Sequence, residues 1–336
     1  MTNDPPAPAG PGTMRAMVQH EYGEAEAVLR MEQVDRPAVG PGEVLVRVHA
    51  AGVDRGAWHL LTGLPYPVRL VAGLRAPRTG VRGLELAGQV AAVGAEVTRF
   101  AVGDEVFGVG EGSFAEYSAA QQDKLAPKPK DLSWEQAAAV GVSACTALQG
   151  VRDHGHVQPG QKVLVIGASG GVGTFAVQIA KAYGAEVTGV CSTAKVDLVR
   201  SLGADHVIDY TATDVTDGTR PYDVILDIGG NRRLKALRRA LTPHGTLVIV
   251  GAETGGRWLG GTDRQLRALA LSPFIGQKTG TFISTQSSAE LAVLTELIES
   301  GKVTPVVDRT YPLAEAPAAI RHLQDGRARG KVVITV

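Results

Sequence analysis

The sequence has few cysteines, no excess of either charge and no long apolar run. Its 336 residues contain only Cys145 and Cys191, too few for a disulfide framework or a four-cysteine zinc lobe. The 34 basic and 34 acidic side chains balance, which leaves no overall electrostatic footprint for nucleic acid or for an anionic membrane. No apolar run approaches the ~20 residues of a membrane-spanning helix, and no signal peptide is visible. These absences predict a cytoplasmic protein without a membrane span or a nucleic-acid partner.

The length predicts about two domains, at ~150 residues each. Apolar residues make up 44% and charged residues 20% of the chain, a globular mixture that excludes wholesale disorder. Residues 1–13 contain four prolines and predict a disordered leader.

The pattern of the chain changes near Ser133. Before it, short runs such as residues 43–50, 88–94 and 104–108 alternate apolar and polar side chains or lie between glycines, which predicts a β-rich unit. Ser133 and Gln136 have capping-box spacing, and residues 137–148 form a predicted helix. From Lys162, predicted strands (162–167, 186–191, 206–208, 222–227, 246–250, 281–284) alternate with predicted helices (172–183, 196–202, 234–241). This alternation is typical of an α/β fold with a doubly wound parallel sheet.

The glycine-rich loop at residues 167–173 is the strongest functional signal. It follows a predicted strand and opens a predicted helix, the setting that a dinucleotide fingerprint requires. Small residues there permit a tight turn and close approach of the backbone to a pyrophosphate. The alternative is a glycine-rich turn without a ligand. The predicted cofactor-binding residues of the loop are Ala168, Ser169, Gly170, Gly171, Val172 and Gly173.

The end of the second predicted strand indicates which dinucleotide binds. An NAD site places an acidic residue there, but this sequence has Ser192, Thr193 and Lys195, which suit a 2′-phosphate. Tyr210, after the third strand, can cover the adenine. Asp197 argues for NAD, but its helical spacing directs it to solvent. We therefore expect NADP(H).

Seven short stretches carry a family resemblance: residues 50–54, 83–88, 102–108, 112–117, 167–173, 202–205 and 329–333. Together they resemble the medium-chain dehydrogenase/reductase superfamily, and more closely its zinc-free quinone oxidoreductase branch. The resemblance implies a GroES-like β-rich catalytic domain from residues 14–136 and 286–336, with a Rossmann-type NADP-binding domain, residues 137–285, inserted between them. It also implies an active site between the domains and an oligomer, for which a homodimer is expected.

The sequence departs from the zinc-dependent members of the family at their ligand positions. Asp54 stands at the position of a zinc-ligand Cys, and Leu84 stands where a Gly-His-Glu motif supplies a His. Asp54, Glu85 and Cys145 form a conceivable substitute ligand set. A buried structural cysteine is the simpler interpretation of Cys145. The prediction is therefore that no metal binds.

Without a metal Lewis acid, reduction of an activated acceptor is easier than oxidation of a simple alcohol. A quinone or an α,β-unsaturated carbonyl takes hydride at carbon and spreads the negative charge itself, so the protein needs positioning, hydrogen-bond donors and a proton source. The predicted function is NADPH-dependent reduction of such substrates. The candidate catalytic residues are Asp54, Trp58, His59 and Tyr66. By resemblance, Thr146, Gly251, Phe282 and Ile283 line the nicotinamide side, and Arg329 reaches the cofactor from the chain end.

Other interpretations stay open at this point. One is NADP-linked reduction of simple aldehydes or ketones, and another is a non-catalytic, cofactor-holding interaction protein. His154 and His156 could form a metal pair, although a polar connection is the favoured reading. Residues 64–80 are apolar with scattered cations and could form a lid over the substrate or touch a membrane surface; the lid is favoured.

Overall fold

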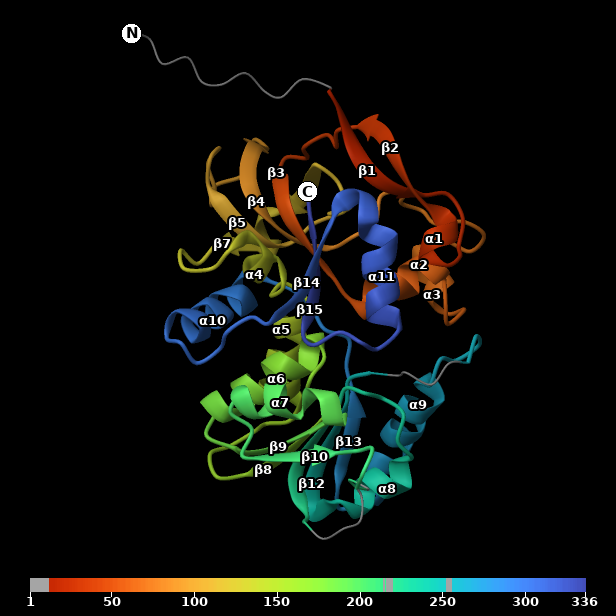
Figure 1. Ribbon diagram of the computed structural model, residues 1–336, viewed down its shortest axis with the longest axis vertical. Helices are drawn as coiled ribbons and strands as arrows, with labels where there is room; N and C mark the ends of the chain where they lie inside the picture. The colour runs from red at the N-terminus through yellow and green to blue at the C-terminus, as the bar shows by residue number, and fades with distance from the viewer. Residues whose placement is uncertain (1–11, 214, 216–219, 252–255) are drawn as a thin grey trace.

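The computed structural model describes residues 12–336 except 214, 216–219 and 252–255. The predicted leader, residues 1–13, lies almost entirely outside the described residues, and strand β1 already begins at Thr13. Two large sheets, one above the other in Figure 1, divide the described chain.

A parallel sheet of six strands forms the lower half in Figure 1. In chain order its strands are β8 (Lys162–Ile166), β9 (Glu186–Cys191), β10 (His206–Asp209), β11 (Tyr222–Asp227), β12 (Leu241–Ile249) and β13 (Lys278–Thr281). Their spatial order is β10-β9-β8-β11-β12-β13, which reverses beside the first strand. That order is the one found in doubly wound dinucleotide-binding sheets, where ligands bind at the carboxyl ends of the strands.

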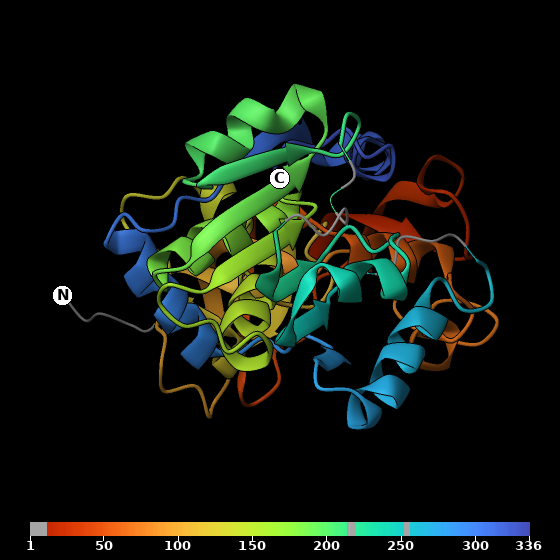
Figure 2. The ribbon, with the colours of Figure 1, turned by 90° about the horizontal axis from the view of Figure 1, so that it is seen from below.

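Helices pack on both faces of this sheet, as Figure 2 shows from below, because its central strands β8 and β11 are mainly apolar on both faces. Val163 and Val165 share a core with α5 and α6, whereas Leu164 and Ile166 share one with α8 and α9. The helices are α5 (Ser143–Gln149), α6 (Gly171–Ala182), α7 (Val196–Ser201), α8 (Leu234–Arg239) and α9 (Thr262–Leu271).

A mixed sheet joins the two ends of the chain, as the resemblance implies. Its order is β14-β15-β3-β4-β5-β7, with β6 paired to β3, and β15 runs antiparallel to β3 with Val332 opposite Val53. These strands are β3 (Glu43–Val53), β4 (Glu85–Val93), β5 (Glu105–Val109), β6 (Tyr117–Gln121), β7 (Leu125–Pro127), β14 (Val307–Pro312) and β15 (Lys331–Thr335).

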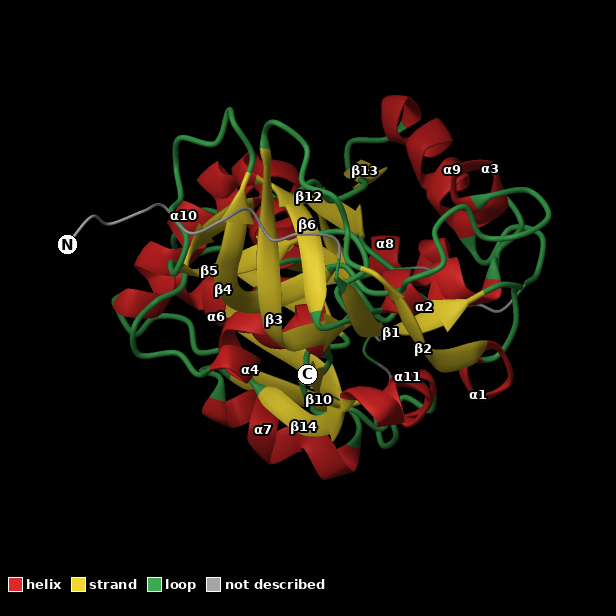
Figure 3. Ribbon diagram, turned by 90° about the horizontal axis from the view of Figure 1, so that it is seen from above, coloured by secondary structure: helices red, strands yellow, loops and turns green. Residues whose placement is uncertain are grey.

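Shorter elements surround the mixed sheet. Strands β1 (Thr13–Gln19) and β2 (Leu29–Asp35) form a separate antiparallel pair, with α1 (Ala25–Val28) between them. The helices of this half are α2 (Arg55–Thr62), α3 (Val68–Ala72), α4 (Trp134–Ala138), α10 (Ser288–Glu299) and α11 (Ala316–Gln324). Figure 3, seen from above, shows α3 on the same side of the molecule as α9 of the other half.

Two sequence predictions of secondary structure are wrong. The helix expected over residues 137–148 is two helices: α4 opens with the predicted capping box, and α5 restarts at Ser143. Between them, the carboxylate of Glu85 accepts hydrogen bonds from the N–H groups of Val142 and Ser143, which compensates for the break in the helix. The last parallel strand is β13 at Lys278–Thr281, three residues before the predicted 281–284.

Candidate active site

The fingerprint loop connects β8 to α6 as the sequence predicts. Gly167 has a φ of +86°, a conformation that favours glycine. A Cβ on Gly173 would lie 2.0 Å from the carbonyl oxygen of Gly167, so helix and loop pack too closely for any side chain. Gly170 is the N-cap of α6 and provides no side-chain cap, so the first-turn N–H groups can bind an anion such as pyrophosphate. The geometry therefore fits a dinucleotide. The loop also contains Ala168, Ser169, Gly171 and Val172.

The C-terminal segment of the chain lies against this loop. The N–H of Gly330 donates to the carbonyl oxygen of Ser169 at 2.9 Å, and Gly170 and Gly330 form a parallel bridge. Exposed Arg329 therefore lies next to the fingerprint loop although it is 160 positions away in sequence.

The predicted cofactor residues follow the carboxyl ends of neighbouring parallel strands, which share one edge of the sheet. Gly167 follows β8, Ser192 follows β9 and Tyr210 follows β10. Gly251 and Phe282 follow β12 and β13. The topology thus brings all five to the edge where dinucleotides bind in this type of sheet.

A carboxylate that the sequence analysis missed lies at the ribose end of this edge. Asp209 is paired in register with Cys191, so β9 and β10 end side by side. The Thr193 hydroxyl donates to Asp209 Oδ2 at 2.5 Å, and this bond is the main reason that the pKa of Asp209 is lowered. The end of the second strand itself has no carboxylate, but the adjacent strand places one beside it. The signal was present in the acidic residue that follows residues 206–208.

Two cations lie near the same edge. Lys195 Nζ donates to the carbonyl oxygens of Gly326 at 2.9 Å and Ala328 at 2.8 Å, which holds the segment before Arg329. Burial is the main cause that lowers the pKa of Lys195, and the charge of Arg329 lowers it further against an opposing effect of Asp308. A third N–H of the ammonium stays available for a ligand. Tyr210 follows β10 at the same edge of the sheet and is 53% exposed.

The residues expected at the nicotinamide end have mixed environments. The Thr146 hydroxyl donates to the Val142 carbonyl at 2.8 Å. Phe282 stacks on His154 with ring centroids 4.2 Å apart, whereas Ile283 is 93% exposed. The carbonyl of Gly251 accepts a hydrogen bond from the guanidinium of Arg264 at 3.1 Å.

Helix α2 presents most of the candidate catalytic residues. Asp54 is its N-cap, and Oδ1 accepts from the N–H of Ala57 at 2.9 Å. Within the described part of the chain, Asp54 Oδ2 and Trp58 Nε1 are buried without a hydrogen-bond partner. Buried polar atoms of this kind are rare in folded proteins, and a bound ligand is one way to satisfy them.

His59 lies on α2. Its Nδ1–H donates to the carbonyl oxygen of Leu64 at 2.7 Å, which leaves Nε2 as the ring nitrogen that can exchange a proton. Tyr66 lies after this turn; its N–H donates to the Arg257 carbonyl at 2.8 Å, and its ring meets Trp258 edge-on at 5.2 Å. Tyr66 therefore contacts the segment before α9 rather than α2.

A buried ion pair that the sequence analysis did not predict joins four segments near this helix. Glu85, at the start of β4, pairs with Lys331, at the start of β15. Lys331 Nζ also donates to the Val53 carbonyl at 3.2 Å and to Ser143 Oγ at 3.0 Å. Burial raises the pKa of Glu85, and the charge of Lys331 opposes that rise. The 246 positions between the partners explain why no local pattern indicated the pair.

Comparisons with known proteins identify the family. Residues 40–130 match the alcohol dehydrogenase GroES-like domain, and residues 202–334 match the family described as zinc-binding dehydrogenase. The chain is 33% identical to the human mitochondrial NAD(P)H oxidoreductase RTN4IP1, over 96% of this chain and 89% of that protein. The chain belongs to the medium-chain dehydrogenase/reductase superfamily. It is therefore an oxidoreductase by family, with relatives that use NAD(P)H.

Other members of this superfamily extend the likeness. The chloroplastic NADPH-dependent alkenal/one oxidoreductase of Arabidopsis thaliana is 32% identical, over 96% of this chain and 80% of that protein. The quinone oxidoreductase structure from Coxiella burnetii has a TM-score of 0.85 at 26% identity, covering 97% of this chain and all of that one. Because the named relatives are mitochondrial or chloroplastic, the cytoplasmic location stays a prediction, as does the homodimer. Among the described residues, no helix has the length and hydropathy of a membrane span.

The residues at the zinc-ligand positions of the superfamily do not fit a catalytic zinc. Leu84 has no donor atom, and the carboxylate of Glu85 is engaged by Lys331 and two backbone N–H groups. The Asp54 carboxylate is engaged as the N-cap of α2, where it accepts the Ala57 N–H. Burial raises the pKa of the Cys145 thiol, which opposes formation of a thiolate ligand. Across residues 12–336, apart from the undescribed positions, no three His, Cys, Asp or Glu side chains are grouped to hold a metal.

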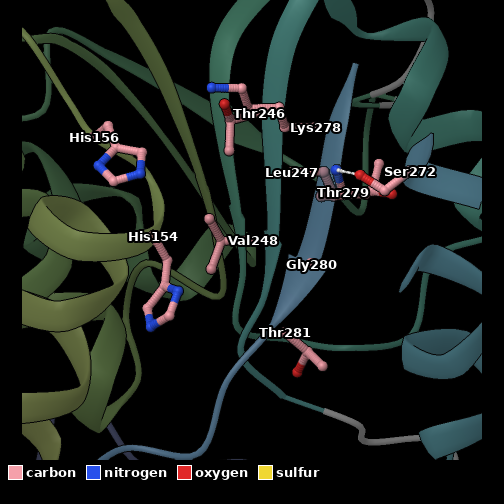
Figure 4. A pocket seen from close by; sticks show the side chains of 10 residues that line it. All are labelled: His154, His156, Thr246, Leu247, Val248, Ser272, Lys278, Thr279, Gly280 and Thr281. Atoms are coloured by element: carbon pink, nitrogen blue, oxygen red, sulfur yellow. Dashed lines mark hydrogen bonds between the residues drawn. The ribbon is translucent and has the colours of Figure 1, made fainter. Parts of the chain in front are cut away.

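A cavity of about 260 Å³ lies elsewhere, along the middle of β12 and β13 (Figure 4). His154, His156, Ser272 and Lys278 are among its lining residues. The fingerprint loop does not line it, although the lining residue Thr281 directly precedes Phe282.

Proposed function

We propose that this protein is an NADPH-dependent reductase that transfers hydride to quinones or α,β-unsaturated carbonyls without a metal ion. The observation that carries the proposal is the contrast within one site. The fingerprint loop fits a dinucleotide, whereas Leu84, Glu85 and Asp54 cannot provide a zinc site. The working domain division is residues 14–136 with 286–336 for the catalytic part and 137–285 for the cofactor part.

When bound, the cofactor supplies hydride from nicotinamide C4. We assign the placement of that ring to Thr146, Gly251, Phe282 and Ile283, which lie on α5 and after β12 and β13. The charge that develops on the acceptor oxygen needs hydrogen-bond donors and a proton. The unpartnered indole N–H of Trp58 is one donor, and His59, whose Nδ1 is fixed by Leu64, presents Nε2 for proton transfer.

Preference for NADPH over NADH rests on charge at the ribose end. Lys195 and Arg329 are cations beside the fingerprint loop, and Ser192 and Tyr210 add polar atoms. A 2′-phosphate gains charge-assisted hydrogen bonds from such a group. The negative charge of Asp209 disfavours a 2′-phosphate at this site. One of its carboxylate oxygens, however, accepts a hydrogen bond from the Thr193 hydroxyl.

His59→Asn tests the proton-transfer role. The asparagine amide can still donate to the Leu64 carbonyl, so the local fold is retained while Nε2 is lost. Because general acid catalysis contributes about 10²–10⁴-fold, we expect kcat with a quinone or an enone to fall roughly 100-fold at unchanged NADPH affinity. His20→Asn, at an exposed histidine paired with Glu32, is the matched control. An unchanged kcat in His59→Asn assigns the proton to water and removes His59 from the mechanism.

A further inference from the structure

Large apolar side chains are exposed on α3, on residues 256–261 and at α9. They are 46–76% exposed and comprise Leu70, Val71, Leu74, Trp258, Leu259, Leu266 and Leu269. We call this set the α3–α9 patch. Isolated exposed apolar residues need no explanation, but a cluster from three neighbouring segments marks an interaction surface.

The segments of the patch are held together by specific contacts. The N–H of Tyr66, just before α3, donates to the Arg257 carbonyl, and the Tyr66 ring meets Trp258. A Cβ on Gly260 would lie 2.8 Å from Pro65, so these backbones approach closely. In Figures 1 and 3, α3 and α9 lie on the same side of the molecule, one in each half.

The net charge around the patch is positive. Residues 55–84 contain five arginines and no acidic residue, although the whole chain is neutral. Arg75 and Arg78, next to Leu74, are exposed, and so is Arg257 beside Trp258. Arg267 pairs with Asp263, so it adds no net charge. The balanced composition of the whole chain therefore hides a local cationic, apolar surface.

We propose that the α3–α9 patch docks the protein on an anionic lipid surface. Leucine, valine and tryptophan side chains enter the headgroup boundary, and arginines at the same surface meet anionic headgroups. A second copy of this chain is the alternative occupant, and sedimentation velocity tests it below. This inference is independent of the proposed function, since it concerns binding and not turnover.

Cosedimentation of the full-length protein with vesicles tests the proposal. One set contains phosphatidylcholine alone, and the other contains equal parts of phosphatidylcholine and phosphatidylserine. We expect binding to the anionic set only, weakened by salt because the Debye length shortens. Arg75→Gln with Arg78→Gln should reduce the affinity roughly 25-fold, at about fivefold per cation. Leu70→Ser with Leu74→Ser should reduce it by roughly tenfold or more.

Two matched double variants serve as controls. Lys235→Gln with Arg239→Gln removes two cations on α8, and Met31→Ser with Val102→Ser removes two exposed apolar side chains elsewhere. Neither should change vesicle binding. Absence of binding to anionic vesicles, or equal losses in the patch and control variants, overturns the proposal. Sedimentation velocity provides a further check: a dimer that becomes monomeric in the leucine variant assigns the patch to a second copy and also overturns it.

Discussion

Removal of the Lys331 ammonium tests whether the buried ion pair with Glu85 holds the site together. Lys331 is 2% exposed and Glu85 is fully buried, so neither charge has water to replace its partner. Lys331→Met keeps the apolar stem and leaves Glu85 with the N–H groups of Val142 and Ser143. Leaving one member of a buried pair uncompensated costs about 3–5 kcal/mol. At about 2–4 °C per kcal/mol, the expected fall in Tm is roughly 10 °C.

The pH dependence of this loss has a definite sign. Burial raises the pKa of Glu85, and the pKa rises further when the opposing charge of Lys331 is removed. A carboxyl with a raised folded-state pKa contributes stability below its unfolded pKa of ~4.3 and loses that contribution as pH rises through the folded value. The stability deficit of Lys331→Met relative to the original protein should therefore shrink from about pH 8 to about pH 5.

Calorimetry and urea unfolding of five proteins measure these effects: the original protein, Lys331→Met, Glu85→Gln, the combination of these two substitutions, and Arg200→Met. Lys331→Met combined with Glu85→Gln should regain most of the loss, because the glutamine carbonyl still accepts from Val142 and no buried charge remains. Arg200→Met is the control, since its pair with Asp197 is exposed and is worth less than ~1 kcal/mol. The reasoning is refuted if Lys331→Met loses less than about 1 kcal/mol, or if the double variant loses the sum of the two single variants.

Four other substitutions test the dinucleotide edge. Gly170→Ala should fold normally, because its Cβ would lie 3.5 Å from the nearest atom. It should nevertheless weaken NADPH binding at least about tenfold, because the methyl group blocks the pyrophosphate. Gly173→Ala should also lower Tm, because its Cβ would overlap Gly167. Titration of nucleotide fluorescence that shows unchanged NADPH affinity in Gly170→Ala contradicts the site. Lys195→Ala should weaken NADPH roughly tenfold and NADH little, as one charge-assisted bond predicts, whereas Asp209→Asn should strengthen NADPH alone. Equal losses for both nucleotides in Lys195→Ala remove the 2′-phosphate assignment.

The order and type of the elements in the parallel sheet were predictable because its strands are short apolar runs between glycines. The strands Glu186–Cys191 and Tyr222–Asp227 have the bounds that the sequence predicts. The break between α4 and α5 was not predictable, since Glu85, which binds the exposed N–H groups, is distant in sequence. An alanine-rich run has high helix propensity, and only the tertiary contact overrides it.

The candidate site was predictable where it depends on local sequence. The fingerprint loop combines glycine geometry with a strand and a helix in sequence, so a short motif describes it. Asp209 binds Thr193 of the neighbouring strand end, and Lys331 pairs with Glu85 from the other end of the chain. Hydrophobic periodicity within one segment does not predict such long-range partners. The His59 bond to Leu64 depends on the turn after α2, which sets an orientation that residue identity alone does not give.

Oxidation of NADPH by chelator-treated protein, with a quinone, an enone and an aliphatic aldehyde in parallel, tests the central claim most directly. The account predicts turnover of the quinone or the enone with NADPH, little turnover of the aldehyde, and no effect of the chelator or of added zinc. Activity restored only by zinc, or turnover confined to the aldehyde, would contradict a metal-independent reductase of activated acceptors. Tight NADPH binding without turnover of any of the three would contradict it as well, in favour of a cofactor-holding protein.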